Sequence, residues 1–447
     1  MDNIQNFNSQ NAEPKIGMCG FKNIGNTCYM NSILQLLIHS KVLINFLFSK
    51  TDPFVDIDIG LIPNDKTLIE MKYDAVFVKY LKRASIQKIV DREKNKNQYL
   101  NQITIQKSEL ENIMSNSITF QLAELINKII YKGCGVVSPR EFKNIINSKI
   151  PSLRGMGQQD CHELLNGLFD NMIQETGIDS EPQINNVPPA IEHYINLKKE
   201  MANLKNLNVS EEVIRSKIDK YTEYVKSNNH IINKYMGLSE MTKVFGKRRT
   251  LDTDTKSTGY NEFIFNLLTF TIDTIKCLGC GFENYVYQYH TNIVLHIEPT
   301  LMECFKKFNK EESIDRRCSM CECKKSIKFT KLWRPGMCLF IELNRFQVIQ
   351  SGHLCKNNLN IEIPDEIDIS EFCDKSMFVD AHPIQYKYKL KGISNHMGGM
   401  RGGHYTADCI SINDDKTWYH FDDSHVSKYD GSNIDKSSAY VLLYELE

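Results

Sequence analysis

The pattern of apolar residues changes near Asn261, and this change limits the fold more than any other feature of the sequence. Up to this point, apolar side chains recur at the three- and four-residue spacing of helices. Beyond it, short runs of β-forming residues are separated by turn-forming Asn, Asp and Gly. A helix-rich segment followed by a strand-rich one predicts an α+β fold. The 447 residues contain no internal repeat and no Pro- or Gly/Ser-rich linker that would divide them into modules.

The spacing also predicts individual elements. One helix is expected to begin at about Cys28, and a second is expected over residues 164–173. Residues 73–132 are predicted to be largely helical. Residues 191–243 are predicted to form inserted helices, because periodic Ile, Leu and Tyr recur there among Lys, Glu and Asn. The expected strands are residues 263–275, 338–346, 386–393, 404–410 and 440–446.

The chain carries 54 basic and 55 acidic side chains, a balance that gives no electrostatic reason to expect nucleic-acid binding. Residues 1–15 form a polar tail, predicted to be disordered, without the apolar core of a signal peptide. The most apolar stretch, residues 33–48, is interrupted by polar side chains and is not expected to span a membrane. We therefore expect a soluble monomer of the cytoplasm, the nucleus or both. In such a protein, 14 cysteines indicate metal binding, catalysis or packing rather than disulfides.

Residues 20–31 place a cysteine at the expected start of a helix. The loop is rich in Gly and Asn, and Cys28 follows it directly. The thiolate is the reactive form of cysteine, and the positive end of a helix dipole lowers the pKa of a thiol. Asn23 lies in the same loop, where its side-chain amide could donate a hydrogen bond to a developing oxyanion. The segment predicts a nucleophile at Cys28, and the alternative is a buried cysteine that packs at a helix start.

A thiol nucleophile needs a general base and a third group that orients this base. His404 follows two glycines, whose backbone can approach a substrate closely, and then enters an alternating strand. A second strand follows the turn at residues 413–415 and leads to Asp422. A hairpin of these strands is predicted to bring Asp422 beside His404, with Asp423 as the alternative orienter. The other histidines of the region do not follow the glycine pair and are not expected to be the base: His396, His420 and His425.

Two cysteine pairs have the C-x-x-C spacing of zinc knuckles: Cys277 with Cys280, and Cys318 with Cys321. Both pairs are flanked by β-like sequence, and four thiolates are the ligand set of a tetrahedral structural zinc. The extra thiol of Cys323 could replace Cys321 as a ligand. One structural zinc ion is therefore predicted, and no catalytic cofactor is expected.

Residues 157–165 predict the start of a helix that carries acidic groups. Asp160 and Glu163 are three residues apart and share one helical face, while the two following leucines turn inward. Exposed acids here would complement a basic substrate segment. The alternative is an ordinary helix N-terminus, where acidic side chains are favourable in any case. Cys161 and His162 are neighbours on a helix and point apart, so they are not expected to form a catalytic pair.

These segments resemble the sequence boxes of the ubiquitin-specific proteases, a papain-like family of cysteine deubiquitinases. The matching stretches occur in the family's order between about residues 17 and 446: Gly20-Phe-Lys-Asn-Ile-Gly-Asn-Thr-Cys-Tyr-Met-Asn31, Gly157-Gln-Gln-Asp-Cys-His-Glu-Leu-Leu165, Gly402-Gly-His-Tyr-Thr-Ala407 and Trp418-Tyr-His-Phe-Asp-Asp-Ser424. The resemblance implies these catalytic residues: Cys28 as nucleophile, Asn23 as oxyanion donor, His404 as base and Asp422 as orienter. It also implies that the arginine-bearing tail of ubiquitin lies along a set of substrate-binding residues: Gln159, Asp160, Glu163 and Gly403.

The resemblance further implies one catalytic domain over residues 16–447, with the family's thumb, palm and zinc-bearing fingers. The fingers would lie within about residues 262–345, and about residues 50–115 and 185–260 would be helical inserts. The implied reaction is thiol-dependent hydrolysis of the (iso)peptide bond at the C-terminal glycine of ubiquitin. The implied partners are ubiquitin and ubiquitinated proteins.

Three other functions fit parts of the sequence. A non-catalytic ubiquitin-binding scaffold would keep the fold without turnover, but the presence of Cys28, His404 and Asp422 argues against it. A protease acting on another ubiquitin-like modifier would share the mechanism and differ in substrate. A zinc-binding interaction module would explain the cysteine pairs and leave the nucleophile and histidine segments unexplained.

Overall fold

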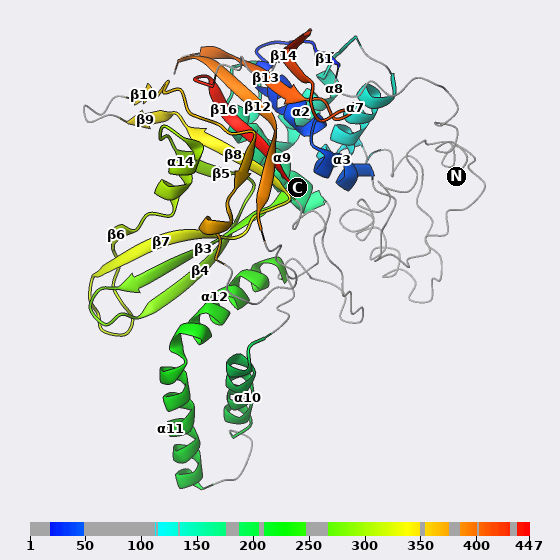
Figure 1. Ribbon diagram of the computed structural model, residues 1–447. Coiled ribbons are helices and arrows are strands. Elements are labelled where there is room, and N and C mark those ends of the chain that lie inside the picture. The colour runs from blue at the N-terminus through cyan, green and yellow to red at the C-terminus, as the bar shows by residue number, and fades with distance from the viewer. Residues whose placement is uncertain are drawn as a thin grey trace, which may run out of the picture.

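The computed structural model describes residues 18–48, 112, 115–132, 135–175, 187–204, 210–246, 267–348, 354–374, 385–399, 402–429 and 436–447 (Figure 1). The expected polar tail and most of the first expected insert lie outside the described residues. The helices of at least eight residues are α2 (Cys28–Ile38), α3 (Lys41–Phe48), α7 (Ile118–Lys132), α8 (Arg140–Lys149), α9 (Cys161–Glu175), α10 (Pro189–Leu204), α11 (Glu211–Ser227), α12 (Asn229–Gly246) and α14 (Leu301–Phe308). The strands are β1 (Gly20–Phe21), β2 (Val136–Val137), β3 (Thr269–Cys277), β4 (Glu283–His290), β5 (Ile293–His296), β6 (Glu312–Asp315), β7 (Lys325–Arg334), β8 (Cys338–Asn344), β9 (Phe346–Val348), β10 (Leu354–Lys356), β11 (Glu366–Asp368), β12 (Lys387–Gly399), β13 (Gly402–Ile410), β14 (Trp418–Asp422), β15 (His425–Tyr429) and β16 (Ala439–Leu446).

The predicted order of helices followed by strands is confirmed, with two departures. The short strands β1 and β2 pair in parallel within the helical part. Helix α14 lies among the strands, and it begins at a capping box that we did not predict. The Thr300 hydroxyl accepts a hydrogen bond from the Glu303 N–H, and the Glu303 carboxylate accepts one from the Thr300 N–H.

The larger sheet holds the second half of the chain together. Its strands run in the order β15-β14-β13-β12-β16-β8-β5, with β11 added beside β12, and only the β5–β8 pair is parallel. Helix α2 packs on β12 and β13 (Figure 1). All 11 residues of α2 are buried, so the helix belongs to the core on every side. This packing holds its first residue, Cys28, against the sheet.

A second sheet of four antiparallel strands, in the order β4-β3-β7-β6, extends away from the larger one (Figure 1). Helix α12 packs directly on β4. A Cβ atom at Gly237 would lie 2.3 Å from the carbonyl oxygen of Tyr285, so the close approach depends on this glycine. Helices over residues 191–243 are confirmed as α10, α11 and α12, and the first two project away from both sheets (Figure 1).

Helices α2 and α3 are both apolar and follow each other directly in the chain. Within the described residues, no single helix has the length and apolar character needed to cross a membrane. Helices α2 and α3 meet that test only as a pair, by length and composition, and they are bent by 82° relative to each other.

Arg345 is fully buried between β8 and β9 and joins the loop after β10 to the start of β16. Its guanidinium donates to the carbonyl oxygens of Ala439, Asn357, Leu359 and Lys436 at 2.5–3.1 Å. We expect Arg345→Met to lower the free energy of unfolding by about 3 kcal/mol or more, because buried carbonyls lose their donors. Equilibrium unfolding in urea would measure the difference.

Arg317→Met is the matched control for this prediction. Its guanidinium is 66% exposed and pairs with Glu322 at 2.9 Å, so its loss should change stability by less than about 1 kcal/mol. Arg345→Lys should not restore stability, because an ammonium lacks the planar set of donors. Equal unfolding energies for Arg345→Met and Arg317→Met would contradict the assigned role of Arg345.

Candidate active site and metal centre

The hairpin of β13 and β14 brings a histidine and a carboxylate together, as the sequence predicts. The strand register pairs Ala407 with Phe421, so that Asp422 follows the paired segment and His404 precedes it. The Nε2 atom of His404 lies 2.6 Å from Oδ1 of Asp422, with both side chains partly exposed. A hydrogen bond from Nε2 to the carboxylate fixes the imidazole tautomer and leaves Nδ1 free to act as the base.

Asp423 makes a different set of contacts, which separates the two candidate orienters. Its carboxylate accepts a hydrogen bond from Nδ2 of Asn23 at 2.9 Å and from Nδ2 of Asn31 at 2.7 Å. Asp423 therefore holds the nucleophile loop, whereas Asp422 contacts the histidine. Asn31 has no place among the predicted site residues, although it stands three residues after Cys28 on the same helix.

Asn23 shapes the loop that leads to the nucleophile. Its Oδ1 accepts hydrogen bonds from the backbone N–H groups of Gly25 at 3.1 Å and Thr27 at 3.2 Å. Its Nδ2 group binds Asp423 with one N–H and retains a second for another acceptor. The second N–H of the Asn23 amide can therefore donate to a substrate oxygen, as the predicted oxyanion role requires.

Cys28 is the first residue of α2 and is 2% exposed. The sequence predicted that the helix start lowers the pKa of this thiol, and the structure favours a higher pKa instead. Burial raises the pKa of the Cys28 thiol above its ordinary value, and the carboxylate of Asp423 acts in the same direction. Hydrogen bonds from the backbone of Tyr405 and Tyr29 act against this shift. Burial thus disfavours the thiolate, and a base that takes the thiol proton is needed for the sulfur to attack.

Tyr405 immediately follows His404, so the backbone that contacts the thiol belongs to the segment that carries the base. Two other histidines of this region, His396 and His420, are engaged elsewhere. His396 is 4% exposed, and burial together with the Lys356 ammonium lowers its pKa to about 4. His420 binds Asp408 at 2.7 Å through Nδ1. His404 is the histidine that combines a carboxylate partner with a position next to the thiol.

The backbone of Gly403, a predicted substrate contact, is bound by a side chain of the enzyme itself. Oε1 of Gln158 accepts a hydrogen bond from the Gly403 N–H at 2.9 Å, and Nε2 of Gln158 donates to the Gly403 carbonyl. A Cβ atom at Gly403 would lie 2.3 Å from Nε2 of His396, so no side chain fits here. Gln158 was absent from the predicted site residues, although it is the first Gln of the Gln-Gln-Asp segment.

The acidic helix start differs in part from its prediction. Glu163 is exposed on the first turn of α9, as expected. Asp160 is half-buried, because Oδ1 accepts the N–H of His162 and Oδ2 accepts the hydroxyl of Tyr440, both at 2.8 Å. The half-buried Gln159 lies beside it. Asp160 is thus a helix cap bound to the sheet, and Glu163 is the acid that faces solvent.

Cys161 and His162 point apart, which confirms that they are not a catalytic pair. Cys161 is fully buried, with its sulfur 3.8 Å from the hydroxyl of Ser394. His162 turns the other way, and its Nε2 lies 2.8 Å from Oε2 of Glu342 on β8. Burial raises the pKa of the Cys161 thiol well above its ordinary value, so this thiol remains protonated.

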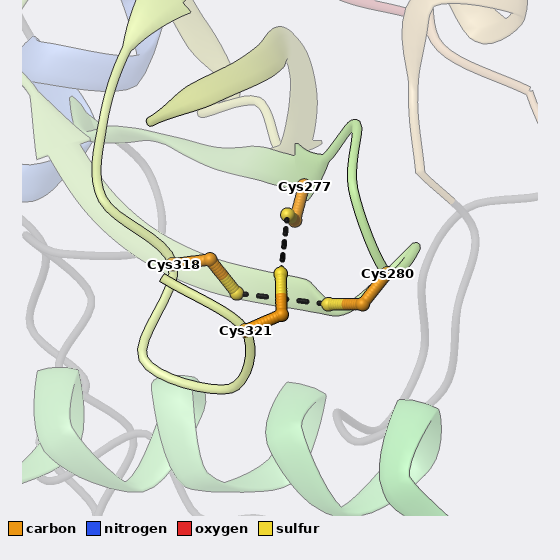
Figure 2. Close-up of side chains that lie close together, drawn as sticks. All are labelled: Cys277, Cys280, Cys318 and Cys321. Carbon is orange, nitrogen blue, oxygen red and sulfur yellow. Dashed lines mark hydrogen bonds between the residues drawn. The ribbon is translucent and has the colours of Figure 1, made fainter. Parts of the chain in front are cut away.

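Four cysteine side chains converge at the far end of the four-stranded sheet. The sulfur atoms of Cys277, Cys280, Cys318 and Cys321 all lie within 4.8 Å of one another. Figure 2 shows them pointing inward from two turns, with Cys277 3.6 Å from Cys321 and Cys280 3.7 Å from Cys318. This grouping could hold one metal ion, and four thiolates favour zinc.

The two turns have the same internal hydrogen bonds, although their sequences differ. In each turn, the first cysteine sulfur accepts the N–H two residues later at 3.3 Å, from Gly279 and Met320 respectively. In each, the first cysteine carbonyl accepts the N–H four residues later at 3.0 Å, from Gly281 and Glu322. Both of these later residues have a positive φ, 72° and 62°. Such turns aim both sulfurs of a pair at one point, which fits a shared ion.

The fifth nearby thiol does not join this group. The carbonyl oxygen of Cys323 accepts the N–H of Cys318 at 2.8 Å, and its sulfur lies 3.7 Å from the carbonyl oxygen of Lys325. Phe282 occupies the equivalent position in the first turn, where its carbonyl accepts the N–H of Cys277 at 2.9 Å. The structure therefore favours Cys321 over Cys323 as the fourth ligand.

Comparison with known proteins agrees with this geometry. The family model described as ubiquitin carboxyl-terminal hydrolase matches residues 19–444. The "Probable ubiquitin carboxyl-terminal hydrolase R319" of Acanthamoeba polyphaga mimivirus is 26% identical, over 96% of this chain and 90% of the relative. "Ubiquitin carboxyl-terminal hydrolase 2" of Bos taurus is 26% identical over 98% of this chain, which spans only 56% of that relative.

A solved structure shares the fold. The "SAGA Ubp8/Sgf11/Sus1/Sgf73 DUB module bound to ubiquitin aldehyde" aligns with a TM-score of 0.54 and 17% identity, covering 100% of this chain and 73% of the other. The expected papain-like fold of the ubiquitin-specific proteases is thereby confirmed. By its family match over nearly the whole length, the chain belongs to the ubiquitin carboxyl-terminal hydrolases, the cysteine-type deubiquitinating peptidases.

Proposed function

We propose that this protein hydrolyses the (iso)peptide bond at the C-terminal glycine of ubiquitin, with Cys28 as nucleophile, His404 as base and Asp422 as orienter. The observation that carries the proposal is the 2.6 Å contact between Asp422 and Nε2 of His404, whose next residue on the strand, Tyr405, binds the Cys28 thiol through its backbone. The family match supports the reaction class. The solved module bound to ubiquitin aldehyde supports ubiquitin as the substrate.

The first step is removal of the proton of the Cys28 thiol. Because burial raises the pKa of Cys28, His404 takes its proton at Nδ1 as the sulfur attacks the glycine carbonyl. The resulting imidazolium is stabilised by the Asp422 carboxylate at Nε2. The negative charge on the substrate oxygen is stabilised by the second Nδ2 proton of Asn23 and by the backbone N–H of Cys28.

Collapse of this tetrahedral intermediate breaks the bond to the lysine amine. His404 returns its proton to the leaving amine, and an acyl-enzyme remains on Cys28. Water then attacks the acyl carbonyl while His404 accepts one of its protons. Release of the thiol frees the ubiquitin carboxylate and restores the resting enzyme. On α9, we place the substrate tail beside Gln159, Asp160 and Glu163, where the exposed Glu163 is suited to an arginine of the tail.

We further propose that the four cysteines Cys277, Cys280, Cys318 and Cys321 hold one zinc ion with a structural role. The matching hydrogen bonds of the two turns and the convergence of the sulfurs support this assignment. When bound, zinc would cross-link the end of the four-stranded sheet and take no part in hydrolysis.

We place the protein in the cytoplasm, the nucleus or both, as a monomer. Among the described residues, the thirteen cysteines are all free thiols. Free thiols in this number suit a reducing compartment.

The proposed function is tested with ubiquitin that carries an electrophile at its C-terminus. We expect the wild-type protein to form a covalent 1:1 adduct, and Cys28→Ala to form none, because the adduct requires the sulfur of Cys28. Intact mass spectrometry measures the adduct, and peptide mapping locates it. An unlabelled wild type, or labelling that persists in Cys28→Ala, would reject the assignment. Hydrolysis of fluorogenic ubiquitin compared with fluorogenic ubiquitin-like modifiers separates the two substrate classes.

A further inference from the structure

The hairpin that carries His404 extends beyond its neighbouring strands. Strand β12 pairs with β16 only as far as Asn395, and β13 pairs with β14 only from Ala407 onward. Past those points, β12 and β13 pair only with each other: Met397 lies opposite His404, and Gly398 lies opposite Gly403. One more backbone bond, from the His396 N–H to the Ser438 carbonyl, reaches the overhang at 2.8 Å. A two-stranded overhang of this kind has little stability of its own.

On the β13 side of the overhang, Gln158 takes the place of the missing strand. Its amide binds both the N–H and the carbonyl of Gly403, as a neighbouring strand would. Gln158 lies in the segment before α9, and that segment also contacts the nucleophile loop. The Nδ2 group of Asn26 donates to the carbonyl of Met156 at 2.8 Å. The base hairpin and the nucleophile loop are therefore connected through residues 156–158.

On the β12 side, Lys356 binds backbone groups of the overhang in a similar way. Its ammonium group donates to the carbonyl of His396 at 2.5 Å and to that of Gly398 at 3.2 Å. Both carbonyls belong to the part of β12 that lies past the last residue paired with β16. Lys356 is the last residue of β10, so it joins the overhang to a different part of the chain.

We propose that Gln158 and Lys356 are positioning residues, which hold the overhanging hairpin from its two edges and thereby keep His404 in reach of Cys28. The inference rests on the proposed function, because it assigns the base to His404. Neither side chain binds the reacting atoms. Each instead satisfies backbone groups on the two sides of the hairpin end from which His404 projects. An error of about 1 Å in the position of a catalytic group costs about a hundredfold in rate, so loosening the hairpin should affect the chemical step.

The test replaces each contact separately in the full-length protein. Gln158→Ala and Lys356→Met should each lower kcat on fluorogenic ubiquitin about tenfold, with KM changed by less than about twofold. Gln174→Ala and Lys387→Met are the matched controls, because they make the same substitutions at exposed residues of α9 and β12. Both controls should match the wild type.

Two further measurements separate positioning from a general loss of structure. Lys356→Arg should recover most of the kcat lost in Lys356→Met, because a guanidinium can also donate to two carbonyls. Hydrogen exchange should accelerate at backbone N–H groups of residues 396–399 and 402–405 in both variants and stay unchanged over residues 388–395, which retain their β16 partner. The alkylation rate of Cys28 by a small reagent at alkaline pH should not fall, because the thiol itself is undisturbed.

Unchanged kcat in both variants, with an active wild type, would overturn the inference. A lower KM and a higher kcat/KM in Gln158→Ala would overturn it in another way, because Gln158 would then obstruct the substrate at Gly403. An inactive wild type is a different result and would reject the proposed function itself.

Discussion

Replacing Asp422 with asparagine is expected to lower kcat by about 10³–10⁴-fold, while KM changes little. The carboxylate lies 2.6 Å from Nε2 of His404, where it accepts a hydrogen bond from the imidazole N–H. An asparagine can present an amide N–H there instead, which favours the wrong tautomer and removes the charge that stabilises the imidazolium. Steady-state kinetics on fluorogenic ubiquitin would measure the loss.

Asp423→Asn is the matched control for this prediction, because the neighbouring residue has the same side chain and a different set of contacts. Its carboxylate holds Asn23 and Asn31, and an amide can keep only one of those two acceptor contacts. Its backbone has a φ of 49°, which asparagine tolerates well. We expect a loss in kcat of about tenfold through the looser Asn23. A larger loss for Asp423→Asn than for Asp422→Asn would contradict the assignment of the orienter.

Contacts set by the geometry of one turn or one hairpin could be predicted from the sequence, and contacts between distant segments could not. The contact between His404 and Asp422 was predictable because two alternating strands joined by a short turn form a hairpin, and a hairpin sets which residues meet. The zinc knuckles were predictable because both cysteines of each pair lie within one turn. In both cases, short-range geometry determines the contact.

The contacts that were missed join distant parts of the chain. Gln158 binds Gly403 across 245 residues, and Lys356 binds His396 across 40. No spacing rule connects these pairs, and each depends on where β12 and β13 lose their neighbouring strands. The raised pKa of Cys28 was missed for a related reason. The helix start predicted a lower value, whereas the burial that opposes it comes from packing of α2 against the sheet.

Two further features were missed: the capping box of α14 and the burial of Asp160. The capping box of Thr300 and Glu303 is a readable signal for α14, and the β-rich surroundings concealed it. Asp160 was expected to be exposed with Glu163, because helical spacing alone places them on one face. The hydroxyl of Tyr440 comes from the last strand of the sheet and takes one oxygen of Asp160, which spacing within the helix does not reveal.

The second large effect is expected at the cysteine cluster, where Cys321→Ala should abolish zinc binding and Cys323→Ala should leave it intact. A structural zinc contributes on the order of 10 kcal/mol to the folding of small zinc sites. Among the four ligand candidates, Cys280 and Cys321 are exposed, and we expect a bound ion rather than a hydrophobic core to hold this end of the sheet. Elemental analysis should find one zinc per chain in the wild type and in Cys323→Ala, and none in Cys321→Ala.

Loss of the ion should loosen the sheet end and leave the distant catalytic hairpin folded. We therefore expect Cys321→Ala to be cleaved by added protease between residues 277 and 325, where Cys323→Ala stays resistant. Its Cys28 should still react with a small alkylating reagent at the wild-type rate, because α2 packs on the other sheet. Retention of zinc by Cys321→Ala together with its loss in Cys323→Ala would assign the fourth ligand to Cys323. That result would mean that the second turn rearranges when zinc binds. In the present structure, the carbonyl of Cys323 accepts the N–H of Cys318, which holds Cys323 in place.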